Sequence, residues 1–89
     1  MNDSYLEVTF RHGRPMAAYY YLPRRPTDKS SRTQRIEPGL VIDFTRAGKP
    51  IGIEILAPDK LTLTAFNQVL GDLGFAPLKA ADLAPLKAA

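Results

Sequence analysis

Two carboxylates, Asp43 and Glu54, stand in the stretch whose residue types and spacing best fit a chemical role. The segment 39–56 reads GLVIDFTRAGKPIGIEIL, two alternating apolar runs around a glycine-containing turn, which indicates a β-hairpin. In the register that matches apolar to apolar residues, both carboxylates lie on one face, diagonal to each other and about 7–8 Å apart at the backbone. That spacing could serve acid/base chemistry or cation binding, and it is equally typical of a solvated outer face.

The apolar faces of the two strands set this register, because a slip of one residue would turn the apolar side chains to the wrong face. The tip then falls at Ala47-Gly48, where glycine adopts a positive φ at low cost. Gly52 stands opposite Asp43. The predicted apolar pairs are Phe44 with Ile51, Ile42 with Ile53, and Leu40 with Ile55.

A basic stretch beside three consecutive tyrosines is the second group that could bind something. Between residues 24 and 35, five Lys and Arg residues against one Asp give +4, so the rest of the chain carries −1 of the net +3. Cations neutralise phosphates and tyrosine rings stack on bases, so this surface could bind nucleic acid. A solvated loop and a contact with an acidic protein or a second subunit are the alternatives. The candidate residues are Tyr19, Tyr21, Arg24, Arg25, Lys29, Arg32 and Arg35.

Other signals of catalysis or metal binding are sparse. The chain has no Cys, and its one histidine, His12, stands in a predicted turn beside Gly13. A metal site at this histidine would need several convergent carboxylates, and a catalytic role would need an orienting partner. The sequence holds no glycine-rich phosphate loop, no GxSxG and no HExxH motif. We therefore expect a protein that is not an enzyme and that has no metal or cofactor.

Length and composition predict one small domain. Eighty-nine residues bury a modest core, so a sheet of this size needs a helix or a second subunit to cover it. The absence of Cys fits a reducing compartment, and no apolar run approaches the ~18 residues of a membrane span. We expect a cytoplasmic protein with no membrane segment.

The N-terminal part reads as strands and a polar loop. Alternation predicts strands over 5–11, 16–22 and 32–37, with a turn at 12–15 and a loop at 23–31. The mostly polar strand 32–37 suits a sheet edge, and Pro38-Gly39 leads into the hairpin. The facing of Tyr19, Tyr20 and Tyr21 stays open, because they must divide between the two sides of their strand.

The C-terminal part reads as helical. Apolar spacing predicts a helix over 62–73, capped by Thr62 and ended by Gly74 in a Schellman motif in which Phe75 reaches back to Leu70. An identical repeat, APLKAA, follows at 76–81 and 84–89. We expect a short helix at about 79–83, interrupted near Pro85. Its leucines, Leu78, Leu83 and Leu86, would dock on the domain or on a partner chain.

Together these elements predict an α+β fold over residues 1–89, with the sheet at 5–56 and the helical part at 60–89. The sheet would be an antiparallel four- or five-stranded meander, with one main helix packed on one face and a short C-terminal helix. The alternative is an all-β meander whose helix packs on a second subunit.

Sixteen residues of the hairpin and of the strand before it form a recognisable pattern: Arg32, Thr33, Ile36, Pro38, Gly39, Leu40, Ile42, Asp43, Phe44, Gly48, Ile51, Gly52, Ile53, Glu54, Ile55 and Leu56. Through this pattern the chain, from Thr33 onward, resembles a family of small bacterial proteins, the domain-of-unknown-function family numbered 2283. The family has no established activity, so the resemblance implies no catalytic residues. It implies a possible pairing with a small neighbouring protein, in the manner of an antitoxin.

Three functions follow as expectations. The first is a non-catalytic protein–protein interaction or regulatory module, with itself as a homodimer or with a small partner protein. The second is nucleic-acid binding through the basic loop 24–35, which is less favoured. The third is a small enzyme that uses Asp43 and Glu54.

Overall fold

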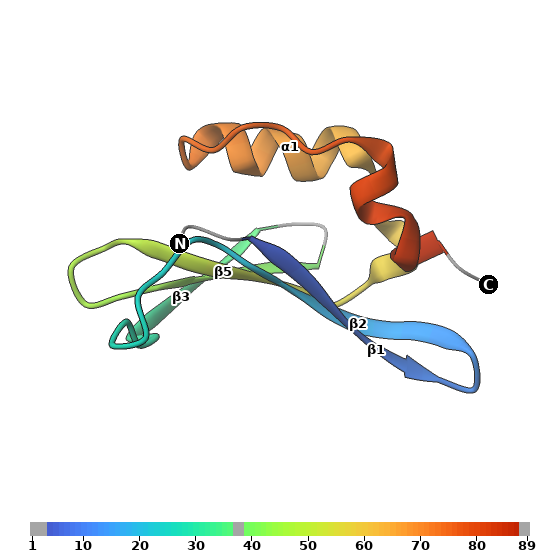
Figure 1. Ribbon diagram of the computed structural model, residues 1–89, viewed down its shortest axis with the longest axis horizontal. Coiled ribbons are helices and arrows are strands. Elements are labelled where there is room, and N and C mark those ends of the chain that lie inside the picture. Colours follow the sequence, from blue (N-terminus) through green and yellow to red (C-terminus); the bar gives the residue numbers. More distant parts are fainter. Residues whose placement is uncertain (1–3, 37–38, 88–89) are drawn as a thin grey trace.

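The computed structural model describes residues 4–36 and 39–87, and it confirms the α+β class: a five-stranded antiparallel sheet with its helices on one side (Figure 1). Predictions that concern Glu37, Pro38 and the last two alanines of the repeat lie outside the described residues. The elements are β1 Tyr5–Arg11, β2 Arg14–Tyr21, β3 Arg32–Ile36, β4 Leu40–Phe44, β5 Pro50–Ile55, the 3-10 helices η1 Pro58–Lys60 and η2 Ala80–Lys87, and the α-helix α1 Leu63–Asp72.

The strand order is β1-β2-β5-β4-β3, so the predicted meander is wrong. β5 takes the centre because its isoleucines are the most deeply buried side chains of the sheet. The polar strand β3 lies at an edge, as its sequence predicted, and a meander would have put it in the middle. The loop after β2 is long enough to carry the chain past β5 and β4 to that far edge. The sheet therefore joins a β1–β2 hairpin to a β3–β4–β5 unit through one contact, β2 with β5.

The central hairpin keeps most of its predicted register. Leu40 pairs with Ile55, Ile42 with Ile53, and Asp43 with Gly52. The pairing of Phe44 with Ile51 is wrong, because a bulge places Phe44 opposite Pro50. Proline has no N–H to give to a ladder, so it is tolerated at the first residue of a strand and beside a bulge.

The turn of the β1–β2 hairpin is two residues shorter than the predicted turn at 12–15. Only His12 and Gly13 form the turn, both with positive φ (53° and 76°), and Arg14 already belongs to β2. A second bulge leaves Met16 without a partner, since Thr9 faces Ala17 and Phe10 faces Pro15. This one-residue shift determines which tyrosine of β2 faces the core.

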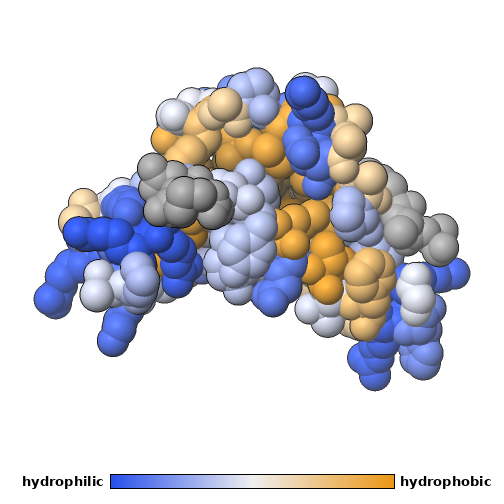
Figure 2. Space-filling model, in the orientation of Figure 1, coloured by the Kyte–Doolittle hydropathy of each residue, from blue (hydrophilic) through white to orange (hydrophobic). Residues whose placement is uncertain are grey.

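Tyr20 is the tyrosine that faces the core, and its ring packs edge-on against Phe66 of α1 with centroids 5.5 Å apart. Tyr19 and Tyr21 point to the other side of the sheet. Figure 2 shows the hydrophobic residues gathered between the helical layer and the sheet. The buried core comprises Ala18, Tyr20, Leu22, Leu40, Ile42, Phe44, Ile51, Ile53, Ile55, Leu61, Phe66, Val69, Leu70, Leu83 and Leu86.

Helix α1 begins and ends as its sequence predicted. The Thr62 hydroxyl accepts a hydrogen bond from the Ala65 N–H at 3.1 Å. At the other end Gly74 has a φ of 87°, and the Phe75 N–H donates to the Leu70 carbonyl at 2.8 Å. This is the Schellman ending, which turns the chain back along the helix.

The C-terminal segment docks on the domain. The Asn67 side chain of α1 exchanges two hydrogen bonds with the Leu78 backbone, at 2.8 and 3.1 Å. The expected interruption at Pro85 is wrong, because η2 runs through this residue. A 3-10 helix has three residues per turn, so Leu83 and Leu86 lie on one face, where both are buried.

We predict that Leu83→Ala lowers the free energy of unfolding by about 2–5 kcal/mol, because Leu83 is only 5% exposed and its loss leaves a cavity beneath η2. Urea titration followed by circular dichroism measures the change. Leu56→Ala is the matched control, since Leu56 is 40% exposed and should cost less than about 1 kcal/mol. Equal costs for the two variants would show that η2 is not part of the core.

Candidate functional site

On the side of the sheet away from the helices, the three strands β2, β5 and β4 bring together four of the predicted site residues, Tyr19, Tyr21, Asp43 and Glu54. Tyr19 pairs with Glu54, Tyr21 with Gly52, and Gly52 with Asp43. Because β2 lies beside β5, the predicted tyrosines and the predicted carboxylates form one surface instead of two. We call this surface, defined by Tyr5, Glu7, Tyr19, Tyr21, Asp43, Gly52 and Glu54, the outer face.

Tyr19 crosses the whole width of β5 to reach β4. Its hydroxyl donates a hydrogen bond to Asp43 Oδ2 at 2.6 Å, and its ring lies over Gly52. A Cβ atom at position 52 would overlap the Tyr19 ring and hydroxyl, so any residue other than glycine would displace Tyr19 from this position. Burial, and then the hydrogen bond to the charged Asp43, raise the pKa of Tyr19 well above its ordinary value. The contact is a charge-assisted hydrogen bond in a half-buried position.

Two further tyrosines extend this contact into an aromatic cluster. Tyr21 stacks on Tyr5 with ring centroids 4.3 Å apart, and it meets Tyr19 edge-on at 4.7 Å. The Tyr21 hydroxyl donates to Glu7 Oε1 at 3.1 Å, and this bond raises the pKa of Tyr21. Sequence reasoning missed Tyr5 and Glu7. The alternation of β1 could have placed both residues on the polar side of the sheet. It could not have predicted their contacts with Tyr21, because the pairing of β1 with β2 depends on the bulge at Met16.

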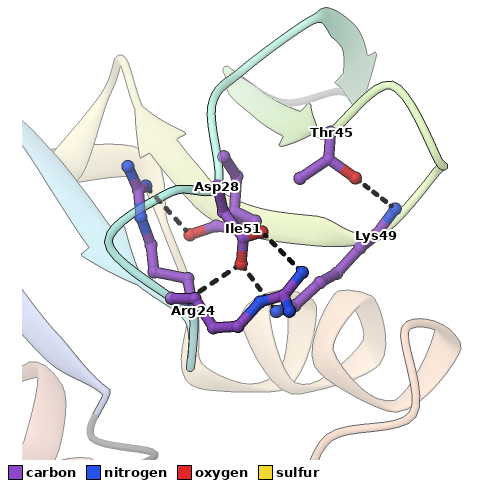
Figure 3. Close-up of polar contacts among 6 residues, drawn as sticks. Arg24, Asp28, Thr45, Lys49 and Ile51 are labelled. Atoms are coloured by element: carbon purple, nitrogen blue, oxygen red, sulfur yellow. Dashed lines mark hydrogen bonds and ion pairs between the residues drawn. The ribbon is translucent and has the colours of Figure 1, made fainter.

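A buried acid anchors the basic loop (Figure 3). Asp28 accepts from Lys49 Nζ at 2.7 Å and from the Arg25 N–H at 2.8 Å, and the Arg25 guanidinium lies 3.6 Å away. The bond from Lys49, and then that from Arg25, lower the pKa of Asp28 to about 2. Asp28 therefore ties the loop to the β4–β5 turn. Sequence reasoning counted it only as a counter-charge.

The five predicted cations do not form one surface. Arg24 lies near Tyr21, with its guanidinium 5.8 Å from the ring centre, and also reaches the Ile51 carbonyl at 3.5 Å. Arg32 packs on the Phe44 ring at 4.9 Å, whereas Arg35 stands opposite Val41 on the other side of β3. Arg25 and Lys29 instead line a surface hollow of about 330 Å³. The lining residues are Arg25, Thr27, Asp28, Lys29, Thr45, Arg46, Ala47 and Lys49.

Two further observations concern metal ligands and membranes. Within residues 4–36 and 39–87, no three His, Cys, Asp or Glu side chains come together as a metal site would require. In the same part of the chain, no helix has the length and apolar character needed to cross a bilayer.

The two carboxylates of the predicted acidic face, Asp43 and Glu54, lie on adjacent strands in the predicted diagonal arrangement. One oxygen of Asp43 accepts the hydrogen bond from the Tyr19 hydroxyl.

Fold and site define a class: a small α+β protein whose antiparallel sheet is covered by helices on one face and presents tyrosines and acids on the other. Residues 17–57 match the family described as protein of unknown function (DUF2283), which confirms the resemblance seen in the sequence. The matched segment runs from β2 to just beyond β5, so it holds Tyr19, Asp43, Gly52 and Glu54. No curated protein and no solved structure gives a significant match.

We predict that Gly52→Ala destabilises the fold by about 2 kcal/mol or more, because the new methyl group displaces Tyr19 and breaks its bond to Asp43. Chemical denaturation measures the loss. The double variant Tyr19→Ala/Gly52→Ala should lose less than the sum of the two single variants, by at least about 1 kcal/mol.

Gly71→Ala is the matched control, because a Cβ at this position of α1 meets nothing within 4 Å. Alanine in an open helical site should stabilise the protein by about 0.5–1 kcal/mol. Additive losses in the Tyr19 and Gly52 cycle would contradict the packing described for this face.

Proposed function

We propose that the protein is a non-catalytic protein–protein interaction module that binds its partner through the outer face. One observation carries the proposal: the helices lie on one side of the sheet (Figure 1), and the opposite side bears an aromatic cluster that is already assembled. Tyrosine is enriched at interfaces because its ring offers a large contact area at a small entropic cost. Stacking and hydrogen bonds hold Tyr19 and Tyr21 in place before any partner arrives.

The charges of the outer face favour a partner with a basic contact segment. Glu7 and Asp43 accept hydrogen bonds from the tyrosine hydroxyls, and Glu54 stands opposite Tyr19 and is exposed. Arg24 is the cation beside them, at the Tyr21 ring. A Lys or Arg of the partner would meet both carboxylates and ring faces, so Coulomb attraction and cation–π contacts would act together. A module of this kind acts by occupying a small basic protein, as a regulatory partner of the antitoxin type does.

We expect Glu54→Arg to weaken partner binding at least about tenfold, because it places a cation among the tyrosines against the partner's own cations. The partner is captured from the source cells on the tagged wild-type chain and identified. The affinity of the purified pair is then measured by calorimetry at two salt concentrations. Binding should weaken as salt rises.

Asp72→Arg is the charge-matched control. Asp72 is exposed at the last turn of α1, where an arginine suits the helix dipole, so binding should stay unchanged. Equal losses in both variants, or the failure of any stoichiometric protein partner to appear, would contradict the proposal.

Nucleic-acid binding is the second candidate, and the basic hollow favours it. Four cations, Arg25, Lys29, Arg46 and Lys49, line this one depression. Fluorescence anisotropy with a single-stranded oligonucleotide at low salt tests it, with Lys29→Glu as the disrupting variant and Arg35→Glu as the control on β3. No binding at low salt would rule it out.

A further inference from the structure

The two edges of the sheet differ in chemistry. β3 closes one edge with a mostly exposed run of Arg32, Thr33, Gln34 and Arg35, whose charges discourage pairing with another chain. β1 closes the other edge with seven residues, and in the described part of the chain it pairs with β2 alone. Its outward backbone groups are thus available to a further strand. The greater length of β1 and its alternating apolar side chains make it the edge better suited to pairing.

Uncovered apolar side chains gather on the β1–β2 hairpin. Leu6 and Val8 are half-buried, whereas Phe10 and Met16 are 49% and 47% exposed. Leu6 and Val8 pack against the core, and alternation along β1 places Phe10 on the same face. The hairpin projects beyond the helical layer (Figure 1). Hydrophobic surface continues from beneath that layer onto the hairpin (Figure 2).

The sequence of β1, YLEVTFR, complements itself when two copies run antiparallel about Val8. On the helix-bearing face, Val8 meets Val8 of the partner subunit, and Leu6 meets Phe10 of the partner subunit. On the outer face, Tyr5 meets Arg11 of the partner subunit, which allows a cation–π contact. Every residue of β1 finds a partner in this register.

Neighbouring registers are poorer. A slip of one residue would place the apolar face of one copy against the polar face of the other. Centring the pair on Glu7 would set two carboxylates directly opposite, and centring it on Thr9 would leave Leu6 unpaired within the strand. In the Val8 register Glu7 is held toward β2 by the Tyr21 hydroxyl, which keeps its charge away from the symmetry axis.

We propose that β1 pairs with β1 of a second copy across a two-fold axis, which joins the two five-stranded sheets into one sheet of ten strands. The inference deepens the proposed interaction function, since it names the chain itself as one partner, but it uses the edge of the sheet and not the carboxylates of the outer face. Tyr5 and the aromatic cluster of each copy would then flank the axis, so that the two outer faces become one surface.

Sedimentation equilibrium tests the association. The wild type should have twice the 9.8 kDa mass of the chain. Phe10→Lys should weaken dimerisation at least about tenfold, because it removes both apolar pairs between Phe10 of one copy and Leu6 of the other and puts a charge against each leucine. Gln34→Lys, on the β3 edge, should leave the dimer intact. Circular dichroism checks that both variants are folded, and a wild type that remains monomeric overturns the inference.

Single cysteines test the register, since the chain has none of its own. Val8→Cys lies on the two-fold axis, within disulfide reach of its copy, and should form a covalent dimer under mild oxidation. Thr9→Cys should not. Crosslinking through residue 9 instead, or through neither, contradicts the proposed pairing. If Phe10→Lys is monomeric yet still binds the basic partner, the dimer and the proposed function are separate; if neither association occurs, both fail.

Discussion

The hydrogen bond from Tyr19 to Asp43, laid across Gly52, is the contact on which the outer face depends. It spans three strands at the one place where the two parts of the sheet meet, since only β2 and β5 join the β1–β2 hairpin to the β3–β4–β5 unit. The neighbouring residue, Tyr20, packs against Phe66 on the other face of the sheet. Two adjacent tyrosines of β2 therefore stabilise the pairing of β2 with β5 from both faces of the sheet.

This arrangement gives a structural reason for Asp43, one of the two carboxylates of the candidate acidic face, and for the glycine opposite it. Asp43 and Gly52 stand opposite each other because one receives the Tyr19 hydroxyl and the other leaves room for its ring. A charged hydrogen bond of this kind typically contributes about 1.5–3 kcal/mol. A small sheet that leaves one face open needs such a contact, because no second apolar layer holds that face together. The same packing orders the tyrosines for a partner.

Much of the fold could be predicted because patterns of neighbouring residues determine single strands, turns and helix ends. Apolar alternation predicted the face and most pairs of the central hairpin, and Thr62 with Gly74 predicted both ends of α1. The sheet order lay beyond reach, because a loop as long as 22–31 allows β2 to lie beside any later strand. Tyrosine facing was equally inaccessible, since it depends on a single unpaired residue, Met16, whose bulge reverses the whole of β2.

The candidate site was likewise predictable only where one hairpin determines the positions of its residues. Asp43 and Glu54 were placed on one face from the hairpin alone, because that inference needs only one turn and two strands. Their neighbours Tyr19 and Tyr21 come from a strand that is distant in sequence, so the joint surface became visible only with the sheet order. The basic loop was recognised from its composition, which does not say where each side chain points. Arg32 and Arg35, for example, face opposite sides of β3.

The ionisation of Tyr19 tests the central contact most directly. A raised pKa means that the folded state favours the protonated hydroxyl, so this stabilisation is present below the ordinary value of 10 and is lost as the pH rises through the folded-state pKa. Ultraviolet titration of the folded chain should find Tyr19 still protonated well above pH 10. That late transition should vanish in Tyr19→Phe and move to lower pH in Asp43→Asn. Ionisation of Tyr19 at its ordinary pKa would contradict the account.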